Sequence, residues 1–247
     1  MKRVLITGAS SGIGQQLAQD YAAAGWHVTA CGRNRERLEA LQVQHPQIEL
    51  CEFDITDLAQ TRSALSNKLV DLAILCAGTC EYLDHGLVEA EKVHRVMQTN
   101  FSGPINCLDS LLPQMQPGSR VALVGSTASL VPLPRAEAYG ASKAALAYFA
   151  RSLAQDVSRQ QVGISLVLPG FVDTPLTRRN DFAMPMIVDV VQASRFIRHG
   201  LEKGKAEIAF PRLFAFILRV TSRLPIALQR LADAENSEVA SAGCNYR

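Results

Sequence analysis

Short apolar runs alternate with longer stretches of helical periodicity along most of this chain. The apolar runs are rich in Val, Ile and Leu and end at Gly, Pro or polar residues, which is typical of strands buried on both faces of a parallel sheet. Runs of this kind occupy residues 3–7, 27–31, 48–53, 71–76, 121–124, 163–168 and 206–210.

The stretches between these runs predict helices at residues 15–24, 36–44, 83–115, 139–159 and 188–203. A further helix is predicted after residue 57 and ends at about residue 68. Strands that alternate with helices build one parallel sheet with helices on both faces. The pattern predicts an α/β fold, a single-domain Rossmann fold with a doubly wound parallel sheet of about seven strands. We expect this domain to occupy residues 1–211, and residues 212–247 to form a C-terminal amphipathic helical extension and tail.

A glycine-rich turn follows the first predicted strand. Residues 7–14 read Thr-Gly-Ala-Ser-Ser-Gly-Ile-Gly, and helical periodicity begins directly after them. Glycine adopts positive φ and lets a ligand approach the backbone closely, while a helix N-terminus offers its amides to an anion. Gly8, Gly12 and Gly14 therefore predict a diphosphate site. Their spacing is G-x-x-x-G-x-G and not the G-x-G-x-x-G of the general dinucleotide fingerprint.

The end of the second predicted strand indicates which dinucleotide is bound. An acidic residue there typically binds the ribose 2′-hydroxyl of NAD. This chain has Gly32 followed by Arg33, so no carboxylate there repels a 2′-phosphate and a guanidinium is present to bind one. NADP(H) is therefore favoured over NAD(H). Arg35 and Arg37 are equally explained as the solvated start of a helix.

Small or polar residues follow the other strands, at the edge of the sheet where open α/β folds bind their ligands. The residues at these ends are Asp54, Ala77-Gly78, Ser126 and Pro169-Gly170. We expect one cleft to contain them together with the glycine turn. Asp54 either caps a helix or contacts an adenine, and Thr56 or Asp57 is placed to cap the helix that follows.

Tyr139 and Lys143 lie four residues apart in a predicted helix, so their side chains share one face. An isolated tyrosine has a pKa near ~10, and a cation within about 4–6 Å lowers such a pKa by roughly 1–3. We expect Lys143 to lower the pKa of Tyr139 so that the phenol exchanges a proton near neutral pH. Taken alone, the pair is also what two surface residues at helical spacing would give.

Asn100 lies in the middle of the long helical stretch, close to Gly103 and Pro104. Glycine and proline are poor helix formers, so we expect the helix to be disturbed there. The amide is then either a satisfied buried group or a functional one.

Composition narrows the class of protein. Of the 247 residues 48% are apolar and 19% charged, and the formal net charge is +2. These values suit a globular core and give no electrostatic reason to expect a nucleic-acid partner. The first apolar run is too short for a signal peptide, and the six cysteines lack C-x-x-C spacing. We expect no bound metal and a reducing, cytoplasmic location.

In combination these motifs resemble the classical short-chain dehydrogenase/reductase family over about residues 3–211. The matches are T-G-x-x-x-G-x-G at residues 7–14, the family's catalytic asparagine at Asn100, Ser126 thirteen residues before the tyrosine, Y-x-x-x-K from Tyr139 to Lys143 and P-G-x-V-x-T at residues 169–174. The resemblance implies an NADP(H)-dependent oxidoreductase that interconverts a carbonyl and a hydroxyl group by hydride transfer, working as a dimer or tetramer.

The resemblance also implies a role for each matching residue. Tyr139 is the acid in reduction and the base in oxidation, and Ser126 hydrogen-bonds the substrate oxygen where charge develops. Lys143 lowers the pKa of Tyr139 and holds the nicotinamide ribose, while Asn100 holds a water that relays protons through Lys143. The residues implied to bind the cofactor are Gly8, Ser10, Ser11, Gly12, Ile13, Gly14, Arg33, Asp54, Ile55, Ala77, Gly78, Tyr139, Lys143, Pro169, Gly170, Val172 and Thr174.

The chain departs from the family pattern after the fourth predicted strand. It reads Leu75-Cys76-Ala77-Gly78 where the family usually has N-N-A-G. The amide that normally braces this strand is missing, and we expect this to affect local bracing more than catalysis.

Two segments leave the substrate and the partners open. The loop at 171–187 is apolar, which indicates a hydrophobic carbonyl compound or alcohol, and its Arg178 and Arg179 are either solvated or bind an acidic group. Residues 211–231 fit a helix packed on the core, an oligomer interface or a cationic helix weakly associated with a membrane surface. A non-catalytic dinucleotide-binding regulatory protein or a membrane-surface scaffold is the alternative function.

Overall fold

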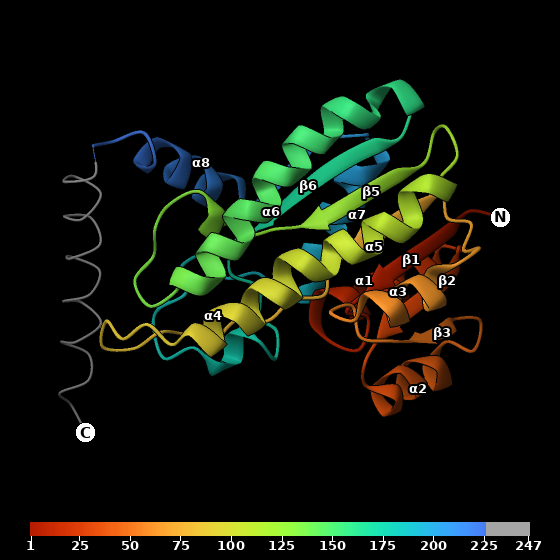
Figure 1. Ribbon diagram of the computed structural model, residues 1–247, viewed down its shortest axis with the longest axis horizontal. Helices are drawn as coiled ribbons and strands as arrows, with labels where there is room; N and C mark the ends of the chain where they lie inside the picture. The colour runs from red at the N-terminus through yellow and green to blue at the C-terminus, as the bar shows by residue number, and fades with distance from the viewer. Residues whose placement is uncertain (226–247) are drawn as a thin grey trace.

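Seven parallel strands form one sheet in this computed structural model, which describes residues 1–225 (Figure 1). The strands are β1 (Arg3–Thr7), β2 (His27–Gly32), β3 (Glu49–Glu52), β4 (Leu72–Leu75), β5 (Arg120–Val124), β6 (Gly163–Pro169) and β7 (Glu207–Phe210). They lie in the order β3-β2-β1-β4-β5-β6-β7. The predicted doubly wound parallel sheet is therefore confirmed.

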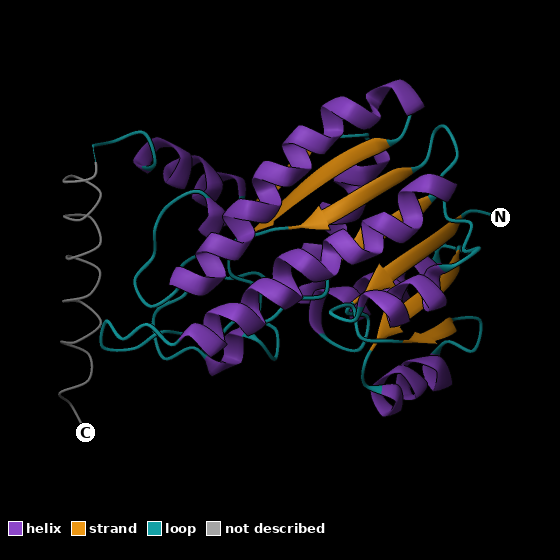
Figure 2. Ribbon diagram, viewed as in Figure 1, coloured by secondary structure: helices purple, strands orange, loops and turns teal. Residues whose placement is uncertain are grey.

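Helices cover both faces of the sheet (Figure 2). They are α1 (Gly12–Ala23), α2 (Arg35–Gln44), α3 (Leu58–Leu65), α4 (Ala90–Met97), α5 (Gly103–Leu111), α6 (Glu137–Asp156), α7 (Val190–Glu202) and α8 (Arg212–Thr221). Helices α1 and α7 pack together on one face, and α3 packs on α5 on the other. Asp57 caps α3, because its carboxylate accepts a hydrogen bond from Gln60 N at 2.9 Å.

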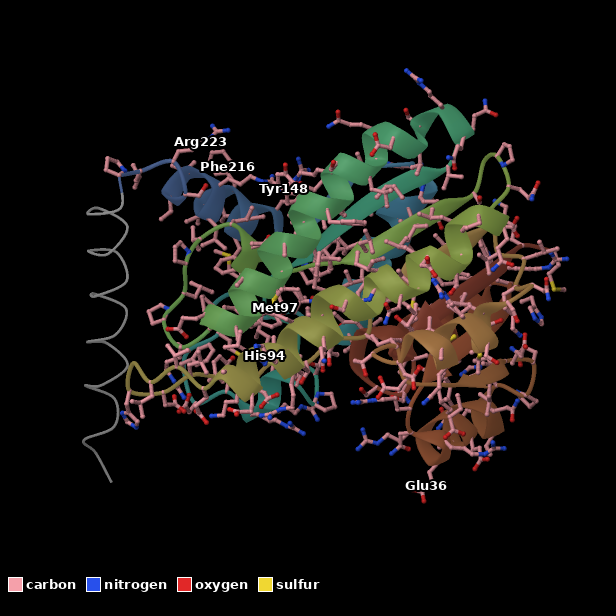
Figure 3. The ribbon with its side chains drawn as sticks, viewed as in Figure 1. Glu36, His94, Met97, Tyr148, Phe216 and Arg223 are labelled. Atoms are coloured by element: carbon pink, nitrogen blue, oxygen red, sulfur yellow. The ribbon has the colours of Figure 1, made fainter. Side chains whose placement is uncertain are left out.

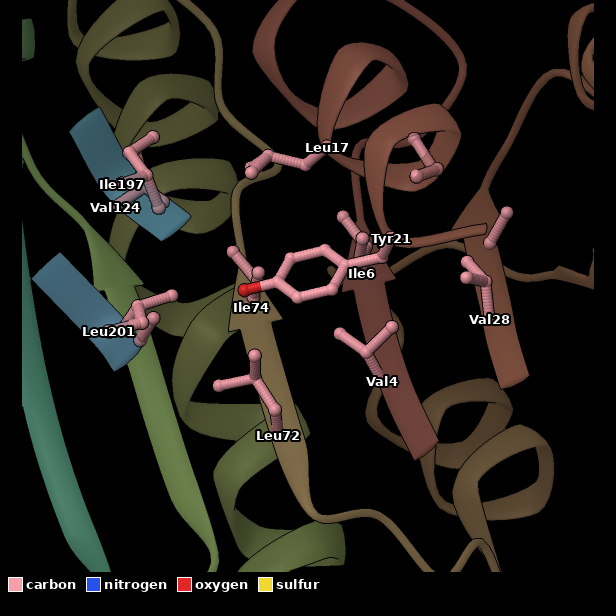
Figure 4. Packing of buried hydrophobic residues seen from close by; sticks show 14 of the residues in the cluster. Val4, Ile6, Leu17, Tyr21, Val28, Leu72, Ile74, Val124, Ile197 and Leu201 are labelled. Carbon is pink, nitrogen blue, oxygen red and sulfur yellow. The ribbon is translucent and has the colours of Figure 1, made fainter. Parts of the chain in front are cut away.

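Successive residues of the central strands alternate between two hydrophobic cores. On β1, Val4 and Ile6 face the core beneath α1 and α7, and Leu5 faces the core beneath α5 and α6. Figure 4 shows Val4 and Ile6 beside Leu17 and Tyr21 of α1. Since every residue of such a strand is buried, these strands appear in the sequence as unbroken apolar runs.

The predicted helix at 83–115 is only partly correct. Residues 83–89 form a loop in which His85 and Gly86 adopt positive φ, a backbone conformation that ends or prevents a helix. Helix α4 begins at Ala90 and passes into a π-helical turn, Gln98–Ser102, before α5 continues the same direction. The expected disturbance around Asn100 is this π-helical turn, a feature often found at functional sites.

The strand order reverses between β1 and β4. The chain leaves β1 toward β2 on one side and returns to β4 on the other, so the connections diverge at the carboxyl ends of these two strands. Ligands of open α/β sheets bind in the crevice at such a switch point.

Candidate active site

A cleft of about 660 Å³ opens at the carboxyl ends of the strands. Every predicted site residue lines it except Asn100, which lies behind the wall. Among residues 1–225, no group of three or more His, Cys, Asp or Glu side chains is placed to hold a metal ion.

The glycine turn forms the floor of the cleft between β1 and α1. Gly8 has a φ of +70°, and a Cβ on it would lie 2.8 Å from Ala77 Cα. A Cβ on Gly14 would lie 2.4 Å from Gly8 O, so a larger residue at either position would collide with backbone. Ser11 precedes α1 without a capping side-chain hydrogen bond. The first amides of α1 therefore remain available to an anion.

Thr7 braces the segment after β4, where the sequence departs from the family pattern. Its Oγ1 accepts hydrogen bonds from Cys76 N at 3.0 Å and from Ala77 N at 3.2 Å. These two bonds connect the end of β1 to the segment after β4, so the cleft floor is supported although the family's amide is absent. The sequence contains Thr7 within the glycine motif, yet only the fold gives it this role.

The far end of the cleft contains a charged pair that sequence reasoning missed. Arg33 Nη1 lies 3.2 Å from Asp54 Oδ2. The statement that no carboxylate is available near Arg33 is therefore wrong, because β3 brings Asp54 beside the end of β2. Arg37 also lines the cleft, whereas Arg35 is paired with Glu39 and does not.

Tyr139 projects from α6 beside Ser126 and Lys143. The Lys143 Nζ lies 5.8 Å from the centre of the Tyr139 ring, as the helical spacing predicts. This Nζ is buried and donates to Val124 O, at the end of β5, at 2.9 Å. Ser126 directly follows that strand and accepts a hydrogen bond from Ala128 N at 3.1 Å.

The expected effect of Lys143 on Tyr139 is not present in this structure. Burial raises the pKa of Tyr139 to about 12, and a hydrogen bond with Ser126 opposes this rise only in part. Burial also lowers the pKa of Lys143 to about 8. Burial is therefore the largest influence on the pKa of both groups, which the spacing of the residues could not reveal.

Asn100 is fully buried and joins two parts of the site. Its Oδ1 accepts from Thr79 N at 2.8 Å, and its Nδ2 donates to Thr79 O at 2.9 Å and to Ser142 Oγ at 3.0 Å. A Cβ on Gly78 would lie 3.3 Å from Asn100 Oδ1 and 3.4 Å from Lys143 Nζ. The asparagine therefore ties the segment after β4 to α6, and it approaches Lys143 behind Gly78.

Two side chains from elsewhere in the chain bind the segment at 171–187. Tyr82 Oη donates to Asn180 Oδ1 at 2.8 Å, and Arg135 Nη1 donates to Asp181 Oδ1 at 2.8 Å. Tyr139 lies close enough to Tyr82 to help raise the pKa of Tyr82. No sequence motif includes Tyr82 or Arg135, so only the tertiary structure shows that they hold this segment.

The two arginines of this segment have different surroundings. Arg178 forms two hydrogen bonds with the carboxylate of Asp173, at 2.7 and 3.2 Å. Arg179 lines the cleft. Phe182 packs edge to face on Tyr82, with ring centres 5.8 Å apart.

The sequence matches the family model for short chain dehydrogenases over residues 2–183. An uncharacterised oxidoreductase from Myxococcus xanthus is 34% identical over 235 residues, which cover 91% of this chain and 93% of the relative. The chain therefore belongs to the short-chain dehydrogenase/reductase family. It is an oxidoreductase that acts on CH–OH groups, and members of this family bind a nicotinamide dinucleotide.

Solved structures share the fold. A short-chain dehydrogenase from Streptomyces avermitilis superposes with a TM-score of 0.81 at 24% identity, covering 99% of this chain and 98% of that chain. A short-chain dehydrogenase from Burkholderia cenocepacia, solved in complex with NADP, superposes with a TM-score of 0.76 at 22% identity and covers 84% of this chain and 95% of that chain.

Proposed function

We propose that this protein is an NADP(H)-dependent oxidoreductase that interconverts a carbonyl and a hydroxyl group on a small, hydrophobic substrate, with Tyr139 as the proton donor or acceptor. The observation that carries the proposal is the position of Tyr139. Its phenol lies beside Ser126 and Lys143 in a cleft whose floor is the glycine turn. One cleft thus contains both a diphosphate cradle and a proton-transfer group.

The residues present fit a dinucleotide. Gly8 and Gly14 leave room that a Cβ would fill, and the first residues of α1, which Ser11 does not cap with its side chain, line the cleft where a diphosphate would bind. Arg33 would hold the 2′-phosphate, and Thr174 lines the same cleft for the nicotinamide end. When bound, the nicotinamide supplies or accepts the hydride.

The protonation states of the site support carbonyl reduction. With a pKa of about 12, Tyr139 carries its proton at neutral pH and donates it to the carbonyl oxygen as that oxygen gains negative charge. Ser126 donates a second hydrogen bond to the same oxygen. Lys143, with a pKa of about 8, is charged at neutral pH and stabilises the phenolate that remains.

The hydrogen bonds of Asn100 limit how it can hold the relay water that the family resemblance implies. Both hydrogens of its Nδ2 are used on Thr79 O and Ser142 Oγ. A water that relays protons to Lys143 would therefore bind Asn100 through the second lone pair of Oδ1. We propose this arrangement for the relay water.

We also propose that the enzyme is cytoplasmic and works as a dimer or tetramer, as the family resemblance implies.

The test is fluorescence titration of the purified protein with NADPH and NADH, followed by cofactor oxidation against aldehydes, ketones and quinones. We expect tighter binding of NADPH and turnover that falls about 10²- to 10⁴-fold in Tyr139→Phe. Tyr148→Phe is the matched control, because Tyr148 lies on the same helix and is exposed. Full turnover in Tyr139→Phe, or no dinucleotide binding by the wild type, would contradict the proposal.

A further inference from the structure

Helix α8 presents an apolar stripe to solvent. Leu213, Phe216, Ile217 and Val220 are exposed, with Phe216 62% accessible. Their spacing of three and four residues places them on one face of the helix. Soluble proteins seldom expose contiguous apolar side chains of this size without a partner.

The opposite face fixes α8 to the body of the protein. Ala215 is buried, and the ring of Phe214 lies 5.8 Å from that of Phe171. The carboxylate of Glu207, on β7, accepts hydrogen bonds from both Arg219 of α8 and Arg151 of α6. The stripe is therefore displayed by an anchored helix.

The exposed charges at the ends of the stripe are positive. The sequence contains no acidic residue from 208 to 232, whereas it contains Arg212, Arg219, Arg223 and Arg230. Arg219 is neutralised by Glu207 of β7. Arg212 and Arg223 are exposed at the two ends of the stripe. Because the whole chain has a net charge of only +2, this is a local concentration of positive charge.

The exposed arginines at its ends argue against a second copy of this chain as the occupant of the stripe. In a two-fold symmetric contact the same surface meets itself, so Arg212 and Arg223 of one copy would lie near those of the other. An anionic lipid surface meets both requirements, since acyl chains accept the apolar stripe and headgroups pair with the arginines.

We propose that α8 docks this enzyme on the surface of an anionic membrane, with Leu213, Phe216, Ile217 and Val220 in the acyl boundary and Arg212 and Arg223 at the headgroups. Within residues 1–225 no helix is long and apolar enough to cross a membrane, so the contact lies in the surface plane. Figure 3 shows Phe216 and Arg223 at one edge of the molecule, with Tyr148 of α6 next along that edge. Tyrosine is favoured at such an interface.

Aromatic contacts lead from this helix toward the active site. Phe214 packs on Phe171, whose ring centre lies 6.2 Å from that of Phe182, and Phe182 packs on Tyr82. Tyr82 is in turn close to Tyr139. If Tyr139 acts as proposed above, docking through α8 would put the substrate side of the cleft beside the bilayer. This favours a lipophilic carbonyl compound or alcohol as substrate.

The test is co-sedimentation of the full chain with vesicles of phosphatidylcholine, with and without phosphatidylglycerol. We expect binding only to the anionic vesicles, and its loss in Phe216→Glu combined with Val220→Glu. Val43→Glu is the matched control, because Val43 is an exposed apolar side chain on α2, which lies at the opposite end of the molecule (Figure 1). The pair Arg212→Gln and Arg223→Gln should weaken binding about 30-fold, since each arginine near an anionic surface contributes about 1 kcal/mol.

Light scattering and NADPH titration of the same variants complete the test. The arginine variants keep the apolar stripe, so they remain informative if the glutamate variant fails to fold. Absence of vesicle binding, or binding that all variants retain, would overturn the proposal. A wild-type oligomer that Phe216→Glu with Val220→Glu dissociates would also overturn it, because a second copy would then cover the stripe. Loss of NADPH binding without loss of vesicle binding would contradict the proposed function alone.

Discussion

Arg33 Nη1 lies 3.2 Å from Asp54 Oδ2, so the guanidinium at the nucleotide end of the cleft already has a partner. Asp54 is fixed, because its Oδ1 accepts hydrogen bonds from Thr56 N and Thr56 Oγ1. Burial acts to raise the pKa of Asp54, but the bonds from Thr56 and Arg33 outweigh it and hold this pKa below its usual value. A 2′-phosphate must therefore share Arg33 with a charged carboxylate.

Replacing Arg33 tests the cofactor preference. Hydrogen bonds to charged groups contribute ~1.5–3 kcal/mol, so Arg33→Ala should weaken NADPH binding about 10- to 100-fold. NADH has no 2′-phosphate, and its affinity should change little. Asp54→Asn should tighten NADPH binding, because it removes the charge that competes for Arg33. Fluorescence titration with both cofactors measures these changes.

Arg35→Ala is the matched control for Arg33→Ala. Both side chains are largely exposed, but Arg35 pairs with Glu39 and Glu52 and does not line the cleft. We expect its removal to leave both affinities unchanged. Equal weakening of NADPH and NADH in Arg33→Ala would show that Arg33 does not read the 2′-phosphate.

The sequence predicts the sheet well because the relevant signals are local. A strand buried on both faces is mainly apolar, so the apolar runs within residues 3–7 and 121–124 can be recognised as strands from the sequence. The site residues at the strand ends follow from the same reasoning, since all parallel strands end at one edge. The Tyr139 and Lys143 pair is likewise a property of helical spacing.

Other features depend on contacts between distant segments, and sequence reasoning missed them. The pairing of Arg33 with Asp54 needs β2 and β3 to lie in register. The raised pKa of Tyr139 depends on how completely the fold buries it, which spacing does not determine. The loop before α4 is likewise held by a distant segment, because Leu83 N donates to Arg135 O. The division between domain and tail at residue 211 stays a prediction, and its part beyond residue 225 lies outside the described residues.

The buried ammonium of Lys143 should make stability depend on pH in a characteristic direction. Its pKa is about 8 in the folded protein, whereas the ordinary value for a lysine, which applies to the unfolded chain, is 10.5. Between these values the unfolded chain binds more protons than the folded one, so folding becomes more favourable as pH rises. From about pH 8 to pH 9.5 the wild type should gain up to roughly 2 kcal/mol relative to Lys143→Met. Urea unfolding at several pH values measures this difference.

Lys68→Met is the control, because the pKa of Lys68 is shifted in the opposite direction to that of Lys143. A hydrogen bond with Glu49 raises the pKa of Lys68, so its contribution is lost only as pH rises past its usual value. Between pH 8 and 9.5 Lys68→Met should therefore keep a constant difference from the wild type. If Lys143→Met and the wild type show the same pH dependence, Lys143 does not titrate in this range.

Arg135 should control the mobility of the segment at 171–187. Its backbone O accepts from Leu83 N at 2.9 Å, and its guanidinium bonds Asp84 and Asp181 at 2.7 and 2.8 Å. It therefore connects three segments around the cleft. Its φ of +65° suits glycine, so Arg135→Gly removes the side chain without straining the backbone.

Hydrogen exchange followed by mass spectrometry measures the effect of Arg135→Gly. Exposed ion pairs contribute ~0.2–1 kcal/mol each, so exchange at 171–187 should accelerate up to about 10-fold while global stability falls by less than about 2 kcal/mol. Arg178→Ala is the control, because Arg178 pairs with Asp173 of the same segment. That ion pair does not connect the segment to the rest of the protein. Equal acceleration in both variants would mean that any lost ion pair loosens the segment. Unchanged exchange in Arg135→Gly would mean that the hydrogen bond from Tyr82 to Asn180 and the aromatic packing of Phe182 hold it without Arg135.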